Sequence, residues 1–219
     1  MANIKAVIYD VDGTLIDTEP LHVKAWSQAL EYIGASLDSL SNEFLSTMAG
    51  KKPAAIAEGM VDKLDLKVTE DELLTTKTAC FLKLVETPEV MPGAIDSIRR
   101  FKATGYRLAI GTSHDRPFVD SMIIKLGLND IFDVIVTADE VSKGKPDPET
   151  YLAAAIRLEI KPEECLVFED ARSGVESAKA SGAFCIAIKN INAAPQKLDE
   201  ADAIVSSFDE ITESLISAL

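Results

Sequence analysis

The stretch AVIYDVDGT, residues 6–14, decides the fold, because four apolar residues run directly into a pair of aspartates. A short apolar run without alternation is typical of a strand that is buried on both faces of a parallel sheet. Asp10 and Asp12 then stand at the carboxyl end of that strand, where parallel α/β sheets bind their ligands. Residues two apart face the same side of a strand, and Gly13 lets the backbone turn. The stretch therefore predicts a strand that delivers two carboxylates to one ligand.

Five further short apolar runs repeat this strand pattern, at residues 106–113, 132–138, 165–170, 183–188 and 203–207. Helical patterns lie between or after them, at residues 92–105, 115–127, 171–182 and 208–219. We expect the first helix to hold Pro92 in its first turn. The last should bury one face, made by Phe208, Ile211, Leu215 and Ile216. The alternation of strands and helices predicts an α/β fold with a doubly wound parallel sheet.

The region from residue 17 to residue 88 breaks this alternation, because it holds helical patterns and no convincing strand. We predict a smaller all-helical domain at residues 17–88, inserted into a discontinuous core domain made of residues 1–16 and 89–219. The start of each predicted helix there carries a capping signal. Thr18 precedes a helix with proline in its first turn, and the pair Thr69 and Glu72 has capping-box spacing.

Composition excludes several classes of protein. The chain has 219 residues, is 47% hydrophobic and carries a net charge of −14, which repels a polyanion. No apolar run approaches the ~20 residues of a membrane span, and the first residues lack signal-peptide features. Cys80, Cys165 and Cys185 have no metal-ligand or C-x-x-C spacing and suit reduced thiols. We therefore expect a cytoplasmic protein whose partner is a small molecule, with no nucleic acid and no membrane. We also expect a monomer rather than an oligomer.

Polar side chains stand at the other strand ends as well. Thr112 and Ser113 end one predicted strand, Glu169 and Asp170 end another, and the loop SKGKPDP offers Lys145. In one crevice, carboxylates such as Asp10 and Asp170 would repel each other unless a cation lay between them. Mg²⁺ fits, since it is commonly held by one or two carboxylates and also binds phosphate oxygens.

This set of residue types suits the transfer of a phosphoryl group. Asp10 as a nucleophile would form an aspartyl-phosphate, which splits one difficult displacement into two easier steps. Asp12 would donate and accept the proton. Lys145 would place a positive charge on the phosphate, and the hydroxyl of Thr112 or Ser113 would hydrogen-bond to it.

Four segments resemble, in order, the four motifs of the haloacid dehalogenase (HAD) superfamily: DVDGTLIDTEPLH, GTSHDRP, KGKPDPETYL and CLVFEDARSGVESAKASGA. The resemblance covers nearly the whole chain and implies a Rossmann-like core. It assigns the nucleophile to Asp10, the acid/base to Asp12 and the phosphate clamp to Lys145, with Thr112 or Ser113 as a phosphate ligand.

The same resemblance implies an Mg²⁺ site. Its ligands would be Asp10, Asp170 and the main-chain carbonyl of Asp12, and Glu169 would lie nearby or act through water. The insertion after the first motif resembles the helical cap of the subfamily that includes β-phosphoglucomutase and many sugar and nucleotide phosphatases. That likeness implies four substrate-facing cap residues, His22, Lys51, Lys52 and Lys77. Each of them has an alternative reading: His22 as a half-buried neighbour of the cap core and the lysines as solvated side chains.

We predict a Mg²⁺-dependent phosphatase that hydrolyses small phosphorylated metabolites, such as sugar, polyol or nucleoside monophosphates, through an aspartyl-phosphate. The first alternative is a β-phosphoglucomutase. In those enzymes a cap-loop arginine, three residues after a glycine, binds the second phosphate, whereas the position after Gly50 here is Pro53, which offers no donor. Lys51 and Lys52 keep that alternative open.

The second alternative is a non-catalytic protein that keeps the HAD core only for binding. The set of Asp10, Asp12, Lys145 and Asp170 is intact, which argues against it.

Overall fold

The computed structural model describes residues 3–48, 53–85, 89–193 and 195–219. The chain divides into two compact units. We call them the core, which consists of Met1–Asp17 and Glu89–Leu219, and the cap, which consists of Thr18–Pro88.

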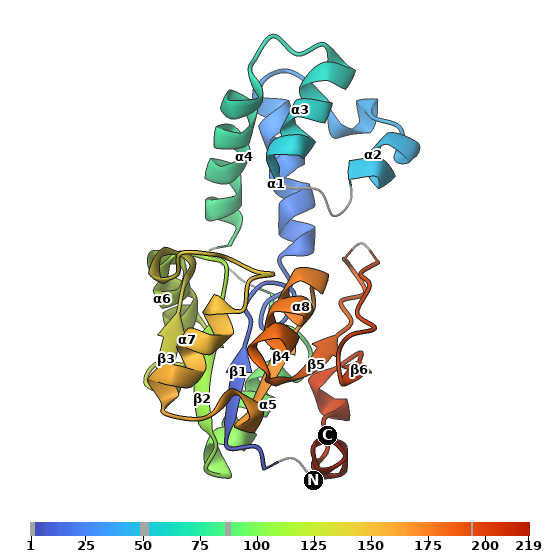
Figure 1. Ribbon diagram of the computed structural model, residues 1–219. Coiled ribbons are helices and arrows are strands. Elements are labelled where there is room, and N and C mark those ends of the chain that lie inside the picture. Colours follow the sequence, from blue (N-terminus) through green and yellow to red (C-terminus); the bar gives the residue numbers. More distant parts are fainter. Residues whose placement is uncertain (1–2, 49–52, 86–88, 194) are drawn as a thin grey trace. The chain divides into compact units, whose positions relative to one another are not determined.

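The core is built on a six-stranded parallel sheet (Figure 1). Its strands are β1 (Ala6–Tyr9), β2 (Arg107–Gly111), β3 (Val134–Val136), β4 (Cys165–Glu169), β5 (Phe184–Ile188) and β6 (Ala203–Val205). All six predicted strands are present, and the order β3-β2-β1-β4-β5-β6 confirms the doubly wound sheet. The chain winds outward from β1 to β3 and then returns to β4 on the other side of β1. This reversal between β1 and β4 makes the switch point at which such sheets bind ligands.

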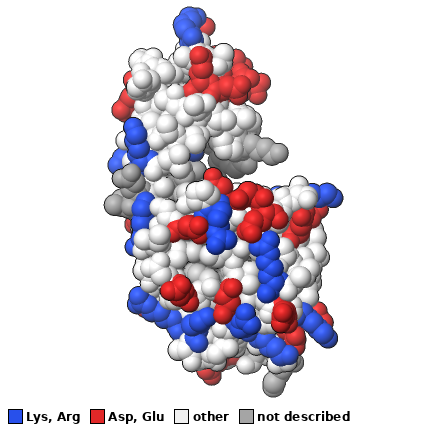
Figure 2. All heavy atoms as spheres, turned by 90° about the vertical axis from the view of Figure 1, so that its left-hand side faces the viewer, with Lys and Arg blue, Asp and Glu red and all other residues white. Residues whose placement is uncertain are grey.

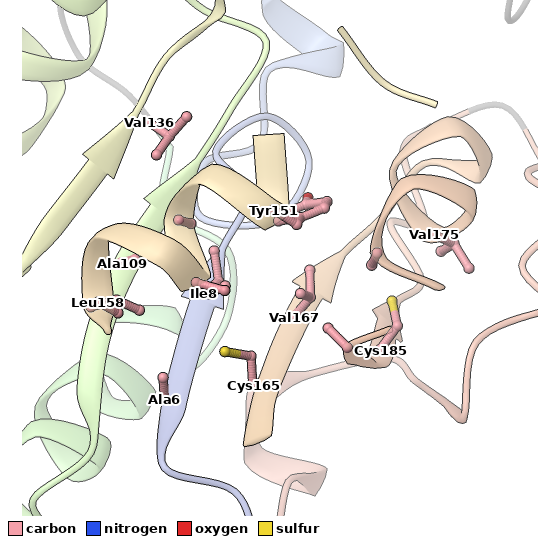
Figure 3. Close-up of a cluster of buried hydrophobic side chains, with 14 of the residues drawn as sticks. Ala6, Ile8, Ala109, Val136, Tyr151, Leu158, Cys165, Val167, Val175 and Cys185 are labelled. Carbon is pink, nitrogen blue, oxygen red and sulfur yellow. The ribbon is translucent and has the colours of Figure 1, made fainter. Parts of the chain in front are cut away.

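Helices cover both faces of the sheet (Figure 1). They are α5 (Ala94–Ala103), α6 (Arg116–Lys125), α7 (Glu149–Leu158), α8 (Arg172–Ser181) and the short α9 (Glu213–Ser217), with 3₁₀ turns at Ala138–Glu140, Pro162–Glu164 and Phe208–Glu210. Figure 3 shows one face, where Ala6 and Ile8 of β1 point toward Tyr151 and Leu158 of α7. The alternate residue Tyr9 turns to the opposite face, in contact with the ring of Phe168 and other aromatic rings. Side chains of β1 are thus buried on both sides, as the unbroken apolar run predicted.

Two helix predictions in the core are wrong in detail. Helix α5 begins at Ala94, because Gly93 is its N-cap in the left-handed conformation at φ 75°, so Pro92 lies before the helix. The predicted helix over 208–219 is interrupted. Ile211 has an extended backbone, and the Thr212 hydroxyl accepts a bond from a later N–H to start α9 afresh.

The described part of the cap is helical throughout. It contains α1 (Glu19–Tyr32), the 3₁₀ turn Leu37–Ser39, α2 (Asn42–Met48), α3 (Pro53–Leu64) and α4 (Glu70–Leu84). The predicted capping box is confirmed, since the side chains of Thr69 and Glu72 each accept a bond from the other's backbone N–H. Thr18 precedes α1 without a capping bond from its side chain. Trp26, Leu30 and Leu73 belong to the cap's own apolar core.

Among the described residues, the helices are all too short or too polar to cross a membrane.

Asp17 belongs to the core, one residue beyond the predicted boundary. Its backbone N–H donates to the carbonyl of Glu89 at 2.8 Å, so the outgoing and returning chains pair. Its carboxylate accepts bonds from the side-chain amides of Asn190 (3.0 Å) and Asn192 (2.6 Å). Three hydrogen-bonding groups of the core therefore fix the point at which the chain leaves for the cap.

Candidate active site

The predicted site residues follow the carboxyl ends of three neighbouring strands. Asp10 continues β1, and its backbone N–H donates to the carbonyl of Phe168 in β4 at 3.0 Å. Thr112 continues β2, and Asp170 follows Glu169 at the end of β4. The parallel pairing of β1 with both β2 and β4 brings these ends to one edge of the sheet, at the switch point.

Lys145 lies at the centre of this edge. Its ammonium group donates to Asp10 Oδ1 at 2.5 Å, to Glu169 Oε1 at 2.7 Å and to the carbonyl of Gly111 at 3.0 Å. The side chain is only 6% exposed. Burial opposes the charge, but the two carboxylates raise the pKa of Lys145 above its ordinary value, so the side chain is a cation. The residue predicted to clamp a phosphate is therefore held as a buried positive charge beside the predicted nucleophile.

Glu169 is engaged on both carboxylate oxygens. Oε1 accepts the Lys145 bond and another from the Tyr151 hydroxyl at 2.6 Å, while Oε2 accepts the backbone N–H groups of Asp170 and Ala171 at 3.1 and 3.2 Å. A Cβ at Gly174 would lie 1.8 Å from Glu169 Cδ, so the absence of a side chain makes room for the carboxylate. Glu169 thus positions Lys145, and its role toward a metal stays a prediction.

The carboxylates outnumber the cation. Asp10, Glu169 and Asp170 can each place an oxygen within 4.8 Å of the others. Burial raises the pKa of Asp10 from 3.8 to about 7, with Lys145 lowering it and Glu169 raising it. Burial and then the charges of Glu169 and Asp10 raise the pKa of Asp170 well above its ordinary range. Three crowded carboxyl groups around a single ammonium fit a hard divalent cation, which prefers oxygen ligands.

The first turn after β1 is shaped to admit Asp170. Gly13 has φ 67°, and a Cβ there would lie 2.0 Å from Asp170 Oδ2. Thr14 Oγ1 donates to the other oxygen of the same carboxylate at 3.4 Å. The glycine that the sequence placed at a turn therefore also lets two strand ends approach each other.

Asp12, the predicted acid/base, contacts a residue that sequence reasoning missed. The distance from Asp12 Oδ2 to His114 Nε2 is 2.5 Å. Thr112 is buried, and its Oγ1 accepts the backbone N–H of His114 at 3.2 Å, which leaves its hydroxyl hydrogen to donate to a phosphate; Ser113 is exposed. His114 stands directly after the predicted phosphate ligands, and a titratable residue at a strand end is the signal that could have found it.

Tyr151 was missed as well, since its position in KPDPETY gives no sign that its hydroxyl reaches Glu169. Burial, followed by the charges of Glu169 and Asp10, raises the pKa of Tyr151 well above its ordinary value, so the hydroxyl is a proton donor.

The cap brings two of its four predicted residues together. His22 Nδ1 of α1 lies 2.8 Å from Lys77 Nζ of α4, and the His22 ring stacks on Phe81 with centroids 4.3 Å apart. Lys77 is buried, with Nζ 4.7 Å from the ring centroid of Phe81 and 5.6 Å from that of Trp26. The solvated reading of Lys77 is therefore wrong, and the substrate role of this pair stays a prediction. Lys51 and Lys52 lie outside the described residues.

Comparison with known proteins shows the family to which the chain belongs. The family model described as haloacid dehalogenase-like hydrolase matches residues 7–188. Fructose-1-phosphate phosphatase YqaB of Escherichia coli is 32% identical over 185 residues, which cover 84% of this chain and 95% of that protein. Among solved structures, CbbY from Rhodobacter sphaeroides in complex with phosphate aligns with a TM-score of 0.76 and 28% identity, over 98% of this chain and 99% of that one.

A crystal structure of a candidate β-phosphoglucomutase from Thermotoga maritima aligns with a TM-score of 0.82 and 29% identity, over 99% of this chain and 100% of that one. The parallel sheet, the acidic strand ends and these likenesses agree, and the chain belongs to the haloacid dehalogenase-like hydrolase family.

Proposed function

We propose that the protein is a Mg²⁺-dependent phosphatase of small phosphorylated metabolites, which works through an aspartyl-phosphate. One observation carries the proposal: a buried lysine lies 2.5 Å from the nucleophile candidate Asp10 and 2.7 Å from Glu169, with Asp170 beside them. A protein that used this fold only for binding would have no need to gather three carboxyl groups around one buried ammonium.

In the first step, a carboxylate oxygen of Asp10 attacks phosphorus, and the bond between phosphorus and the substrate's ester oxygen breaks. Asp12 gives its proton to that oxygen, so an alcohol leaves. In the second step, Asp12 takes a proton from water, whose oxygen attacks the phosphorus of the aspartyl-phosphate. Inorganic phosphate departs, Asp10 is restored as a carboxylate and Asp12 is again protonated.

The remaining residues hold the phosphate. Lys145 neutralises charge beside Asp10, and the hydroxyls of Thr112 and Ser113 donate to phosphoryl oxygens. Asp10, Asp170 and the main-chain carbonyl of Asp12 would hold Mg²⁺, with Glu169 nearby or acting through water. When bound, Mg²⁺ supplies positive charge next to the phosphoryl oxygens.

The substrate class we propose is sugar, polyol or nucleoside monophosphates. The name of the Escherichia coli relative, a fructose-1-phosphate phosphatase, supports a sugar phosphate. A cavity of about 400 Å³ in the core, lined in part by Asp170, Asn190 and Gln196, has the size of a small-molecule site. His22 and Lys77 would contact the part of the substrate beyond the phosphate.

The partner we propose is a small molecule and not a nucleic acid. On the face of the core that Figure 2 draws, the described basic and acidic side chains are interspersed. The three cysteines have free thiols, which suits a cytoplasmic location.

The competing function is that of a β-phosphoglucomutase, which the likeness to the Thermotoga maritima structure favours. A mutase must hold a second phosphate, and the position expected to supply an arginine is Pro53, the first residue of α3. Proline lacks a donor, so hydrolysis is favoured.

The test is a panel of phosphorylated metabolites assayed for phosphate release with Mg²⁺ and with a chelator. We expect release only with Mg²⁺ and none from Asp10→Asn, which lacks the nucleophile. Turnover by metal-free protein, or normal kinetics in Asp10→Asn, would contradict the proposal. In parallel, β-glucose 1-phosphate with a trace of glucose bisphosphate is followed by phosphorus NMR. Rapid accumulation of glucose 6-phosphate with little free phosphate would establish the mutase instead.

A further inference from the structure

His114 is fixed in place by contacts that do not involve Asp12. Its ring stacks on Phe118, with centroids 3.7 Å apart and planes 16° from parallel. Its backbone N–H donates to Thr112 Oγ1 at 3.2 Å, and its carbonyl accepts the N–H of Ala138 at 2.8 Å. Two hydrogen bonds therefore hold the backbone of His114, and the stack on Phe118 holds its ring.

Asp12 is more exposed to solvent than Asp10. It lies in the turn after β1, and its side chain is 37% exposed, whereas that of Asp10 is 9% exposed. The ammonium group of Lys145 bonds to Asp10 and Glu169. The contact of 2.5 Å between Asp12 Oδ2 and His114 Nε2 is thus a bond from a fixed ring to a carboxyl group in a turn.

We propose that His114 is a positioning residue for Asp12. Its Nε2–H donates to Oδ2 and sets the orientation of that carboxyl group relative to the phosphate held by Thr112 and Lys145. The inference rests on the proposed function, in which Asp12 gives a proton to the leaving oxygen and later takes one from water.

Alkyl and aryl phosphate esters differ in how much the departure of their leaving group depends on the proton from Asp12. An alkyl phosphate, such as a sugar phosphate, releases a strongly basic alkoxide and depends on a well-placed acid. 4-Nitrophenyl phosphate releases a stable phenolate and needs little help in the first step. Both pass through the same aspartyl-phosphate, whose hydrolysis again requires Asp12 as a base. Misplacement of Asp12 should therefore slow the first step for the alkyl ester and only the second step for the aryl ester.

Two variants distinguish the effect of the Nε2–H donor of His114 from that of its aromatic ring. His114→Phe keeps an aromatic ring to stack on Phe118 and removes the donor. His114→Gln removes the ring but carries an amide N–H that reaches about as far as Nε2. Each is compared with the natural protein for kcat and KM on the fastest alkyl phosphate of the panel and on 4-nitrophenyl phosphate. Stopped-flow absorbance follows the first turnover of the aryl ester, and thermal unfolding confirms that both variants fold.

For His114→Phe we expect a fall in kcat of about 10- to 100-fold on the alkyl phosphate, with KM changed less than twofold. With 4-nitrophenyl phosphate we expect a burst of one nitrophenolate per site, followed by a slow steady rate. His114→Gln should recover most of the lost kcat. Equal slowing of the first step for both esters, Gln no better than Phe, or unchanged kinetics in His114→Phe would overturn the inference.

Failure of this inference is distinguishable from failure of the proposed function. If the natural protein releases no phosphate, or if Asp10→Asn stays active, the proposed function fails whatever His114 does. If the natural protein is active and Asp10→Asn is not, the kinetics of the two His114 variants test only the positioning role of His114.

Discussion

Each unit of this protein buries a lysine, and the two are held in different ways. In the core, Lys145 donates to carboxylates that come from the ends of β1 and β4. In the cap, Lys77 lies against an imidazole nitrogen and two aromatic rings carried by α1 and α4. A substitution of Lys145 changes the charge balance of the proposed chemistry, whereas a substitution of Lys77 changes a packing arrangement between two helices. The effects of the two should therefore differ in size and in kind.

The largest effect is expected from Lys145→Ala. Its loss leaves Asp10, Glu169 and Asp170 without a neighbouring ammonium group, which favours the protonated form of the nucleophile. It also removes the positive charge that would lie beside the bound phosphate. We expect kcat/KM to fall about 1,000-fold, or ~4 kcal/mol of barrier, in steady-state assays with the best substrate. The control is Lys143→Ala in the same loop, whose side chain is 74% exposed and which should change little. A fall in kcat/KM of less than about threefold for Lys145→Ala would show that this lysine does not take part in catalysis.

A comparably severe structural effect is expected from Gly174→Ala. In an exposed helix, replacing glycine by alanine usually raises the free energy of unfolding by about 1 kcal/mol. A decrease at Gly174 would therefore point to a steric clash. Here the new Cβ would lie 1.8 Å from Glu169 Cδ, and the carboxylate cannot move without losing its four hydrogen bonds. We expect the free energy of unfolding to fall by about 2–4 kcal/mol in chemical denaturation.

The matched control is Gly144→Ala, where a Cβ meets nothing within 4 Å. It should stay within about 0.5 kcal/mol of the natural protein. A stabilised Gly174→Ala protein would show that Glu169 has room to shift, and would weaken the contrast between a rigid core site and the cap.

A pH effect of intermediate size follows from the crowded carboxyl groups. The pKa of Asp10 is raised from 3.8 to about 7 and that of Asp170 is raised in the same direction. A carboxyl group whose folded pKa is raised stabilises the fold fully below the unfolded pKa and loses that contribution as pH rises through the folded pKa. The metal-free core should therefore become less stable from about pH 4 to about pH 7.

Mg²⁺ should offset this loss, because it favours the ionised carboxylates and competes with their protons. We expect millimolar Mg²⁺ to raise the midpoint of thermal unfolding more at about pH 8 than at about pH 5, in scanning calorimetry. An equal shift at both pH values would place the ion away from Asp10 and Asp170.

The smallest effect is expected in the cap, from Lys77→Met, which keeps a long apolar side chain and removes the charge. We expect kcat/KM for the best substrate to fall about 3- to 10-fold, or ~0.7–1.4 kcal/mol, with kcat on 4-nitrophenyl phosphate unchanged. Lys83→Met, at an exposed position of the same helix, serves as the control. An effect as large as that of Lys145→Ala would mean that the cap takes part in the chemical step.

The same contrast explains what could be predicted from the sequence. Unbroken apolar runs indicated all six strands, and the convergence of Asp10 and Asp170 followed from the rule that parallel strand ends share an edge. Lys145 lies in a loop, and the family resemblance indicated its place in the site. The contact between His114 and Asp12 joins residues 102 positions apart, and its one sign in the sequence was a titratable residue at a strand end. Tyr151 reaches Glu169 only because α7 lies against the sheet. The apolar spacing over 208–219 fitted a single helix, but it carried no sign that Ile211 would be extended.

The pairing of Asp17 with Glu89 has a consequence for how a protein of this kind can evolve. The backbone of the two connecting segments is already joined by a 2.8 Å hydrogen bond, and an isolated bridge pairs Ile16 with Val90. A segment whose ends meet inside the host can be lengthened, exchanged or shortened at little entropic cost, since the closure penalty grows only slowly with length. The residues that would carry out catalysis therefore lie in a core domain that can accept different inserted segments. Under the proposed function, exchange of the segment between Asp17 and Glu89 would change the cap residues that contact the substrate and leave the strand ends proposed to hold the phosphate unchanged.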